Sequence, residues 1–125
     1  MRVVIAEDER IIALGLASLL KKLGHDVRSL CSSGERCIEL VEAERPDVVF
    51  MDIRMDGPMD GIEAAAVVKA RFGTPVIFTT AFDDRHTRER AAEVSPAAFL
   101  TKPVGGDSIR GAMAKIDVAA VPKAL

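Results

Sequence analysis

Residues 48–61, "VVFMDIRMDGPMDG", change from wholly apolar to acidic within a few positions. Residues 48–51 have the character of a strand that is buried on both faces of a sheet. Asp52 follows this strand with no polar spacer. A carboxylate that continues a buried run is costly to remove from water unless a partner balances its charge. The segment therefore predicts a core strand that ends on a functional carboxylate.

Short apolar runs of the same kind recur along the chain and alternate with longer segments of helical periodicity. The predicted strands are 3–6, 27–31, 48–51, 76–80 and 97–101. The predicted helices are 10–23, 34–44, 61–72, 84–94 and 107–119. This alternation predicts an α/β fold, in which a doubly wound, five-stranded parallel sheet of order 2-1-3-4-5 is covered by five helices, as in flavodoxin.

The residues between these segments support the same boundaries. Gly24 and Gly73 stand where helix C-terminal caps are expected. Asp60, with Glu63 three residues later, is typical of a capping box at the start of the third helix. The second strand is more polar than the others, so we expect it at an edge of the sheet.

Composition limits the class of protein. The chain has 125 residues and a formal net charge of −2, which suits one soluble domain and argues against a nucleic-acid binder. The two cysteines, Cys31 and Cys37, fit no zinc or redox spacing and are expected to be small buried thiols. With neither a signal peptide nor a membrane span expected, the prediction is a cytoplasmic domain over 1–118, followed by a tail or linker over 119–125.

Polar residues gather where the predicted strands end. Glu7 and Asp8 follow the first strand, Asp52 follows the third, Thr80 ends the fourth and Lys102 follows the fifth. The carboxyl ends of parallel strands share one edge of a sheet, where ligands bind. Crowded carboxylates repel one another, and a divalent cation with oxygen ligands such as Mg²⁺ relieves that repulsion. With a lysine and a hydroxyl nearby, the set predicts phosphoryl transfer onto an aspartate.

Other polar residues have simpler explanations. Glu9, Asp56 and Asp60 are better explained as loop or helix-capping residues, and a capping role for Asp8 also stays open. His25 and His86 are interpreted as surface histidines without a catalytic role.

Four motifs in order, "IAEDE", "VVFMDIRM…MDG", "VIFTTA" and "AAFLTKPV", resemble the receiver domain of two-component response regulators. The resemblance covers about residues 2–117, and the loop after the third strand is also similar to receivers found beside sensor histidine kinases. It implies that Asp52 accepts a phosphoryl group from a histidine kinase or a histidine phosphotransfer protein. It further implies an Mg²⁺ site formed by Glu7, Asp8, Asp52 and the backbone carbonyl of Arg54.

The resemblance also assigns a switch. Thr80 is the hydroxyl that moves toward the phosphoryl group, Lys102 grips the phosphoryl oxygens, and the Lys102–Pro103 bond is expected to be cis. Phe99 is the aromatic residue that turns inward after Thr80 moves, although a packing role alone is the alternative for it. Phe82, two residues beyond Thr80, is a candidate lid that keeps water from the acyl phosphate.

Three departures from the family pattern stand out. Glu7 replaces the more usual aspartate, and the loop after Asp52 is one residue longer, with Asp56 at a usual proline position. Gly105 and Gly106 precede the last helix, next to the helix 4, strand 5 and helix 5 face that is a candidate homodimer surface.

Alternatives to a phosphoacceptor remain. A receiver-like docking module that works without phosphate is the main rival. An aspartate-dependent phosphatase would need a second acid where Arg54 stands, so we expect no enzyme of that kind. A flavin or nucleotide carrier would need a glycine-rich loop where "AEDER" stands.

Overall fold

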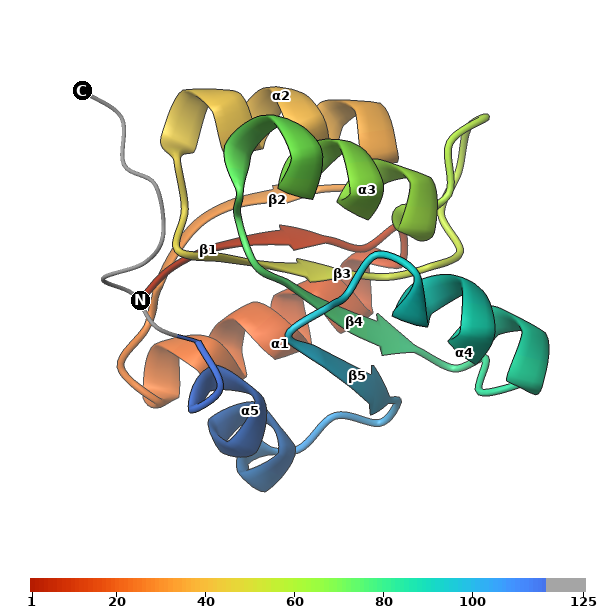
Figure 1. Cartoon of the computed structure of the whole chain (residues 1–125). Coiled ribbons are helices and arrows are strands. Elements are labelled where there is room, and N and C mark those ends of the chain that lie inside the picture. The colour runs from red at the N-terminus through yellow and green to blue at the C-terminus, as the bar shows by residue number, and fades with distance from the viewer. Residues whose placement is uncertain (117–125) are drawn as a thin grey trace.

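A computed structural model describes residues 1–116 as alternating strands and helices (Figure 1). The strands are β1 (Arg2–Ala6), β2 (Asp26–Cys31), β3 (Val48–Met51), β4 (Val76–Thr80) and β5 (Ala98–Thr101). The helices are α1 (Arg10–Lys22), α2 (Gly34–Glu44), α3 (Gly61–Phe72), α4 (Arg85–Ala92) and α5 (Gly106–Met113).

All five strands are parallel and lie in the order β2-β1-β3-β4-β5, which confirms the predicted fold class and the edge position of β2. Ala6 at the end of β1 lies opposite Met51 at the end of β3. Thr80 and Thr101 are partners at the ends of β4 and β5. This register brings the residues that follow β1, β3 and β5 to one edge of the sheet.

The sheet separates two hydrophobic layers because alternate residues of each strand point to opposite faces. Val4, Val49 and Phe78 face the layer that includes α2, α3 and Ala91 of α4. Ile5 and Phe50 face the layer formed by α1 and α5. Figure 1 shows α2 and α3 together on one side of the sheet, and α1 and α5 on the other. The central strands are buried on both faces, as their apolar sequences predicted.

The helix ends follow their local sequence signals. The Asp60 side chain accepts the N–H of Glu63 at 2.9 Å, and the Glu63 side chain accepts the N–H of Asp60 at 3.0 Å, which confirms the capping box. Gly73 ends α3 with φ +67°, and Gly24 follows α1 with φ +92°, the left-handed conformation that favours glycine.

The last helix is shorter than predicted. It ends at Met113 instead of continuing to 119, and Lys115 and Ile116 bond to carbonyls three residues back in tighter turns. The predicted residues 117–119 and the tail or linker over 119–125 lie outside the part of the chain that the structure describes. Within 1–116, none of the helices combines the length and apolar character needed to cross a membrane.

Candidate functional site

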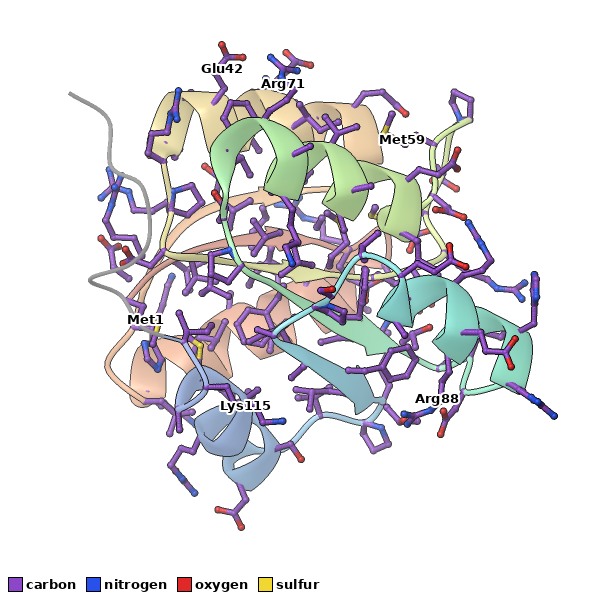
Figure 2. All side chains as sticks on the ribbon, in the orientation of Figure 1. Met1, Glu42, Met59, Arg71, Arg88 and Lys115 are labelled. Atoms are coloured by element: carbon purple, nitrogen blue, oxygen red, sulfur yellow. The ribbon has the colours of Figure 1, made fainter. Side chains whose placement is uncertain are left out.

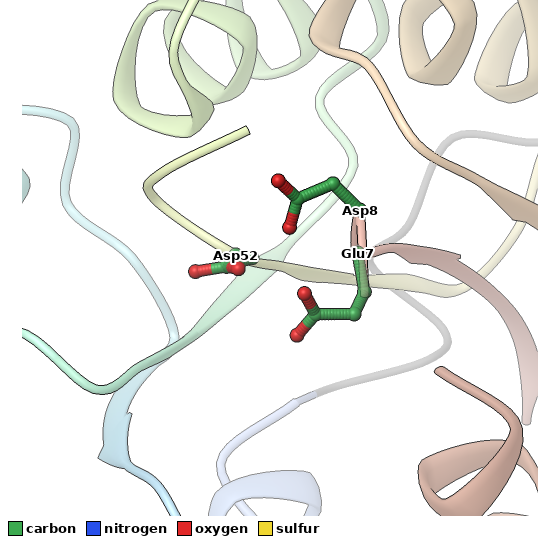
Figure 3. A group of neighbouring side chains, drawn as sticks. All are labelled: Glu7, Asp8 and Asp52. Atoms are coloured by element: carbon green, nitrogen blue, oxygen red, sulfur yellow. The ribbon is translucent and has the colours of Figure 1, made fainter. Parts of the chain in front are cut away.

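Three carboxylates from two neighbouring strands meet at the carboxyl edge of the sheet. Glu7 and Asp8 follow β1, and Asp52 follows β3, where its N–H donates to the carbonyl of Ala6 at 2.9 Å. One carboxylate oxygen from each of the three lies within 4.8 Å of the others. Figure 3 shows the three side chains converging on a shared space. The strand register therefore forms the acidic cluster that the sequence predicted.

Lys102 is the cation that meets this cluster. Its Nζ donates to Asp52 Oδ2 at 3.2 Å and forms a second, shorter ion pair with Glu7. Its backbone N–H donates to the carbonyl of Thr80 at 2.8 Å, so β4 fixes the position of the lysine. The Lys102–Pro103 bond is cis, as predicted. The Glu7 contact was not predicted, because the sequence placed both residues at one edge without showing which acid the lysine meets.

Within residues 1–116, the acidic groups of the cluster outnumber the one ammonium group that pairs with them. Burial, followed by the nearby Glu7 carboxylate, raises the pKa of Asp52 to about 7 against the opposing effect of Lys102. Burial also raises the pKa of Asp8, and Glu7 adds to that rise. Burial also acts to raise the pKa of Glu7, but the hydrogen bonds of Glu7 with Lys102 and Asp52 outweigh this effect and lower its pKa overall. One ammonium group thus does not neutralise three acids, and a divalent cation with oxygen ligands fits this donor set.

Thr80 ends the buried strand β4 beside this site. Its side chain is fully buried, and its Oγ1 accepts the backbone N–H of Phe82 at 3.1 Å. A threonine hydroxyl rotates easily and can also donate a hydrogen bond. Movement of the hydroxyl toward another acceptor would therefore release the start of the loop between β4 and α4.

Two loops at this edge touch through an arginine and an aromatic ring. The guanidinium carbon of Arg54, two residues after Asp52, lies 3.8 Å from the ring centroid of Phe82. This cation–π contact joins the loop after β3 to the loop after β4. Phe82 is 42% exposed, so one part of its surface faces solvent while Arg54 covers another. The predicted lid residue therefore lies against the loop that carries Asp52.

Phe99, in the middle of β5, is partly buried and faces the α4 side of the sheet. Its ring meets Phe78 edge to face, with centroids 6.4 Å apart. The guanidinium carbon of Arg88 in α4 lies 4.4 Å from its centroid. Sequence reasoning also missed this arginine contact, since nothing in the spacing of the sequence relates Arg88 to β5.

The remaining acids of the segment 52–60 have separate positions. Asp60 caps α3 and also pairs with Arg90 of α4 at 2.9 Å, so its interpretation as a capping residue is confirmed. Asp56 is exposed, and its charge contributes to the raised pKa of Asp8. Glu9 is the N-cap residue of α1 but makes no side-chain capping bond. The N-cap position of α1 is therefore Glu9 and not Asp8, for which the sequence left a capping role open.

Gly61, at the start of α3, brings that helix against the backbone of Asp52. Its N–H donates to the carbonyl of Ile53 at 2.7 Å, and a Cβ at this position would lie 2.8 Å from the carbonyl carbon of Asp52. A side chain cannot fit there unless the backbone moves. The sequence showed this glycine only as the residue after a helix cap, so its close approach to Asp52 was not predicted.

This doubly wound sheet, with its acidic cluster and lysine at the carboxyl edge, defines an α/β domain whose charged site is centred on a buried aspartate. The model of the response regulator receiver domain matches residues 3–114, and the chain belongs to this family of two-component signalling domains. The family resemblance inferred from the four motifs is thereby confirmed.

Two regulatory proteins that are similar in sequence support this assignment. The chain is 38% identical over 102 residues to the transcriptional regulatory protein PdtaR of Mycobacterium tuberculosis, covering 82% of this chain and 49% of that protein. It is 37% identical over 118 residues to the positive alginate biosynthesis regulatory protein of Pseudomonas aeruginosa, covering 92% of this chain and 46% of the relative. The chain thus spans about half the length of these relatives.

Solved structures agree with the fold. The signal receiver domain of a modulated diguanylate cyclase from Desulfovibrio desulfuricans G20 superimposes with a TM-score of 0.87 at 36% identity, covering 92% of this chain and 91% of that one. The signal receiver domain of the putative response regulator NarL from Mycobacterium tuberculosis gives a TM-score of 0.83 at 31% identity, with 90% and 92% covered.

Proposed function

We propose that the chain is a phosphoacceptor, in which Asp52 takes a phosphoryl group from a phosphohistidine of a kinase or phosphotransfer protein. The position of Asp52 carries this proposal. It is buried among Glu7, Asp8 and Lys102, yet it lies at the carboxyl edge of the sheet where a donor can approach. In the transfer, an oxygen of Asp52 forms a bond to phosphorus as the bond from phosphorus to the imidazole nitrogen breaks.

The surrounding residues have separate roles in metal binding, phosphoryl binding and switching. Glu7, Asp8, Asp52 and the carbonyl of Arg54 would hold Mg²⁺, which when bound neutralises charge on the phosphoryl oxygens. Lys102 Nζ, already 3.2 Å from Asp52, is placed to bind a phosphoryl oxygen. The Thr80 hydroxyl would exchange the N–H of Phe82 for the phosphoryl group. Asp52 itself ends as the modified group, so the chain acts as an acceptor and not as an enzyme.

A donor also needs a surface beside Asp52. Ile11, Ile12 and Leu14 of α1 are among the most exposed large apolar side chains within residues 1–116. Next to them, a groove of about 450 Å³ runs between α1 and the loop after β5 and reaches Lys102. We propose that an apolar helix carrying the phosphohistidine docks here, because the groove leads to the site and its walls are mostly apolar.

Two other expectations remain proposals. A cytoplasmic location suits a phosphohistidine donor and the two buried free thiols, Cys31 and Cys37. A homodimer through α4, β5 and α5 would use the face that contains Phe99, and sedimentation of the unmodified and phosphorylated protein tests it.

Incubation with Mg²⁺ and acetyl phosphate, followed by intact mass spectrometry, tests the phosphoacceptor function. We expect a mass increase of one phosphoryl group on the wild type and no increase on Asp52→Asn. Omission of Mg²⁺ should abolish the wild-type increase. If the folded wild-type protein stays unmodified with acetyl phosphate and with phosphoramidate, the rival docking module is the better description.

A further inference from the structure

A chain of contacts links the Thr80 hydroxyl to the ring of Phe99 through α4. Thr80 Oγ1 accepts the N–H of Phe82, and the next residue is Asp83. Asp83 accepts the hydroxyl of Thr101 at 3.3 Å and forms a close ion pair with Arg88. Arg88 in turn lies over the ring of Phe99, 4.4 Å from its centroid. In Figure 2, Arg88 lies beside α4, close to the tip of β5.

Phe99 lies where the contact with Arg88 can affect the position of its ring. The ring is only partly buried and lines a groove of about 340 Å³ between α4 and β5, together with Arg88, Ala91 and Pro96. A phenylalanine in such a position gains from any group that covers its face, and a guanidinium does so through a cation–π contact. Arg88 therefore stabilises the partly buried ring where it borders the groove.

We propose that Arg88 is a positioning residue that holds Phe99 at the groove in the unphosphorylated protein and releases it when Thr80 turns toward a phosphoryl group. This inference rests on the proposed function, since it concerns the switch that follows phosphorylation of Asp52. When the Thr80 hydroxyl leaves the N–H of Phe82, the loop that carries Asp83 loses one anchor, and the weak bond from the Thr101 hydroxyl is the remaining contact between Asp83 and β5. Arg88 then loses the carboxylate that keeps it above the ring.

The energetics fix the size of the expected effect. Exposed cation–π contacts correspond to about a two- to fivefold shift in a two-state equilibrium. Arg88 is accessible and its ion pair with Asp83 is at the surface, with 51% of the arginine side chain exposed. Its removal should thus change the balance between the two Phe99 positions without unfolding the domain.

The test compares variants of two arginines on the same helix. Arg88→Ala removes the contact with Phe99, whereas Arg85→Ala removes an arginine that pairs with Glu89 at 2.9 Å and has 92% of its side chain exposed. Arg88→Lys keeps a cation. The readouts are the ring resonances of ¹⁹F-labelled Phe99 and the affinity for beryllofluoride, a phosphoryl analogue, in the presence of Mg²⁺.

We expect Arg88→Ala to move the unliganded Phe99 resonance toward its position in beryllofluoride-bound protein and to tighten beryllofluoride binding about two- to fivefold. Arg85→Ala should match the wild type, and Arg88→Lys should recover part of the difference. Asp83→Asn should act in the same direction as Arg88→Ala, because it removes the anchor of the guanidinium. In a Phe99→Leu background, Arg88→Ala should no longer alter the affinity.

Unchanged Phe99 resonances and unchanged affinity in Arg88→Ala would overturn the inference, as would weaker beryllofluoride binding. An equal effect of Arg85→Ala would also overturn it, because the cause would then be the general charge of α4. Failure of the proposed function has a different signature: wild-type protein would neither bind beryllofluoride nor accept phosphate. In that case the unliganded Phe99 resonance still tests the contact, because Arg88→Ala should move it and Arg85→Ala should not.

Discussion

Asp52 occupies a position where its own negative charge is unfavourable. Its folded pKa of about 7 lies above the value of about 4 expected for an unfolded aspartate. Between those two pH values the folded protein holds a proton that the unfolded chain has lost. Raising the pH through this range therefore lowers the free energy of unfolding, and the loss is complete once the folded carboxyl ionises.

Asp52→Asn should consequently stabilise the metal-free, unphosphorylated protein. We expect a gain of about 2 kcal/mol in the free energy of unfolding above pH 7 and little gain near pH 4. The gain is smaller than the full pKa shift would give, because the substitution also removes the ion pair with Lys102. Urea unfolding at several pH values in the presence of a chelator measures it. A destabilised variant at pH 8 would contradict the unbalanced charge described for this cluster.

Gly61 controls the approach of α3 to the phosphoacceptor. A Cβ in Gly61→Ala would meet the backbone of Asp52, so we expect a loss of about 1–3 kcal/mol in stability and slower labelling by acetyl phosphate. Gly111→Ala in α5 is the matched control, because nothing lies within 4 Å of its new Cβ. That control should gain about 0.5–1 kcal/mol from helix propensity and keep normal labelling.

Equal stability of Gly61→Ala and Gly111→Ala would show that the start of α3 does not constrain Asp52. Thermal unfolding followed by circular dichroism and a time course of acetyl phosphate labelling together make that comparison.

Phe82 is the residue for which a lid role stays a prediction. Its contact with Arg54 keeps it against the loop that carries Asp52, where an apolar ring hinders the approach of water. We expect Phe82→Ala to shorten the lifetime of the acyl phosphate several-fold, and Arg54→Ala to shorten it less, since the ring remains. His86→Ala, an exposed change in α4, is the control. An unchanged decay rate in Phe82→Ala excludes the lid.

At the scale of the elements, the strands and helix starts were predictable because each depends on local chemistry. Strands such as β3 are buried on both faces and therefore consist of continuous apolar residues. The capping box of Asp60 and Glu63 likewise depends on only four consecutive residues, so the sequence alone reveals it. The predicted end of the last helix was wrong, because the apolar residues keep a helical spacing past Met113 whereas the backbone there forms tighter turns.

Contacts between elements were less predictable. The parallel sheet brings Glu7, Asp8 and Asp52 together, so strand order alone predicted the acidic cluster. The arginine contacts of Arg54, Arg88 and Arg90 depend on how helices and loops lie against one another. A long, flexible arginine can reach many partners, and the sequence does not select one of them.

At the scale of the whole molecule, donor recognition and phosphoryl chemistry should be separable. Ile11→Ser and Ile12→Ser remove apolar surface from α1 without touching the acidic cluster. We expect each to slow transfer from a phosphohistidine donor by about tenfold or more, as for central interface residues, and to leave acetyl phosphate labelling unchanged. Arg36→Ser, an exposed change on α2, is the control. Loss of acetyl phosphate labelling would show damage to the site itself.

The two hydrophobic layers have a consequence for how many proteins can be bound at once. The proposed donor surface lies on α1, which packs against one layer, whereas Phe99, with Arg88 over its ring, packs against the opposite one. A kinase seated on the first would leave the second open to solvent. A downstream target could then bind beside Phe99 before the donor leaves α1. Donor, receiver and target would form a three-component assembly in which neither partner displaces the other.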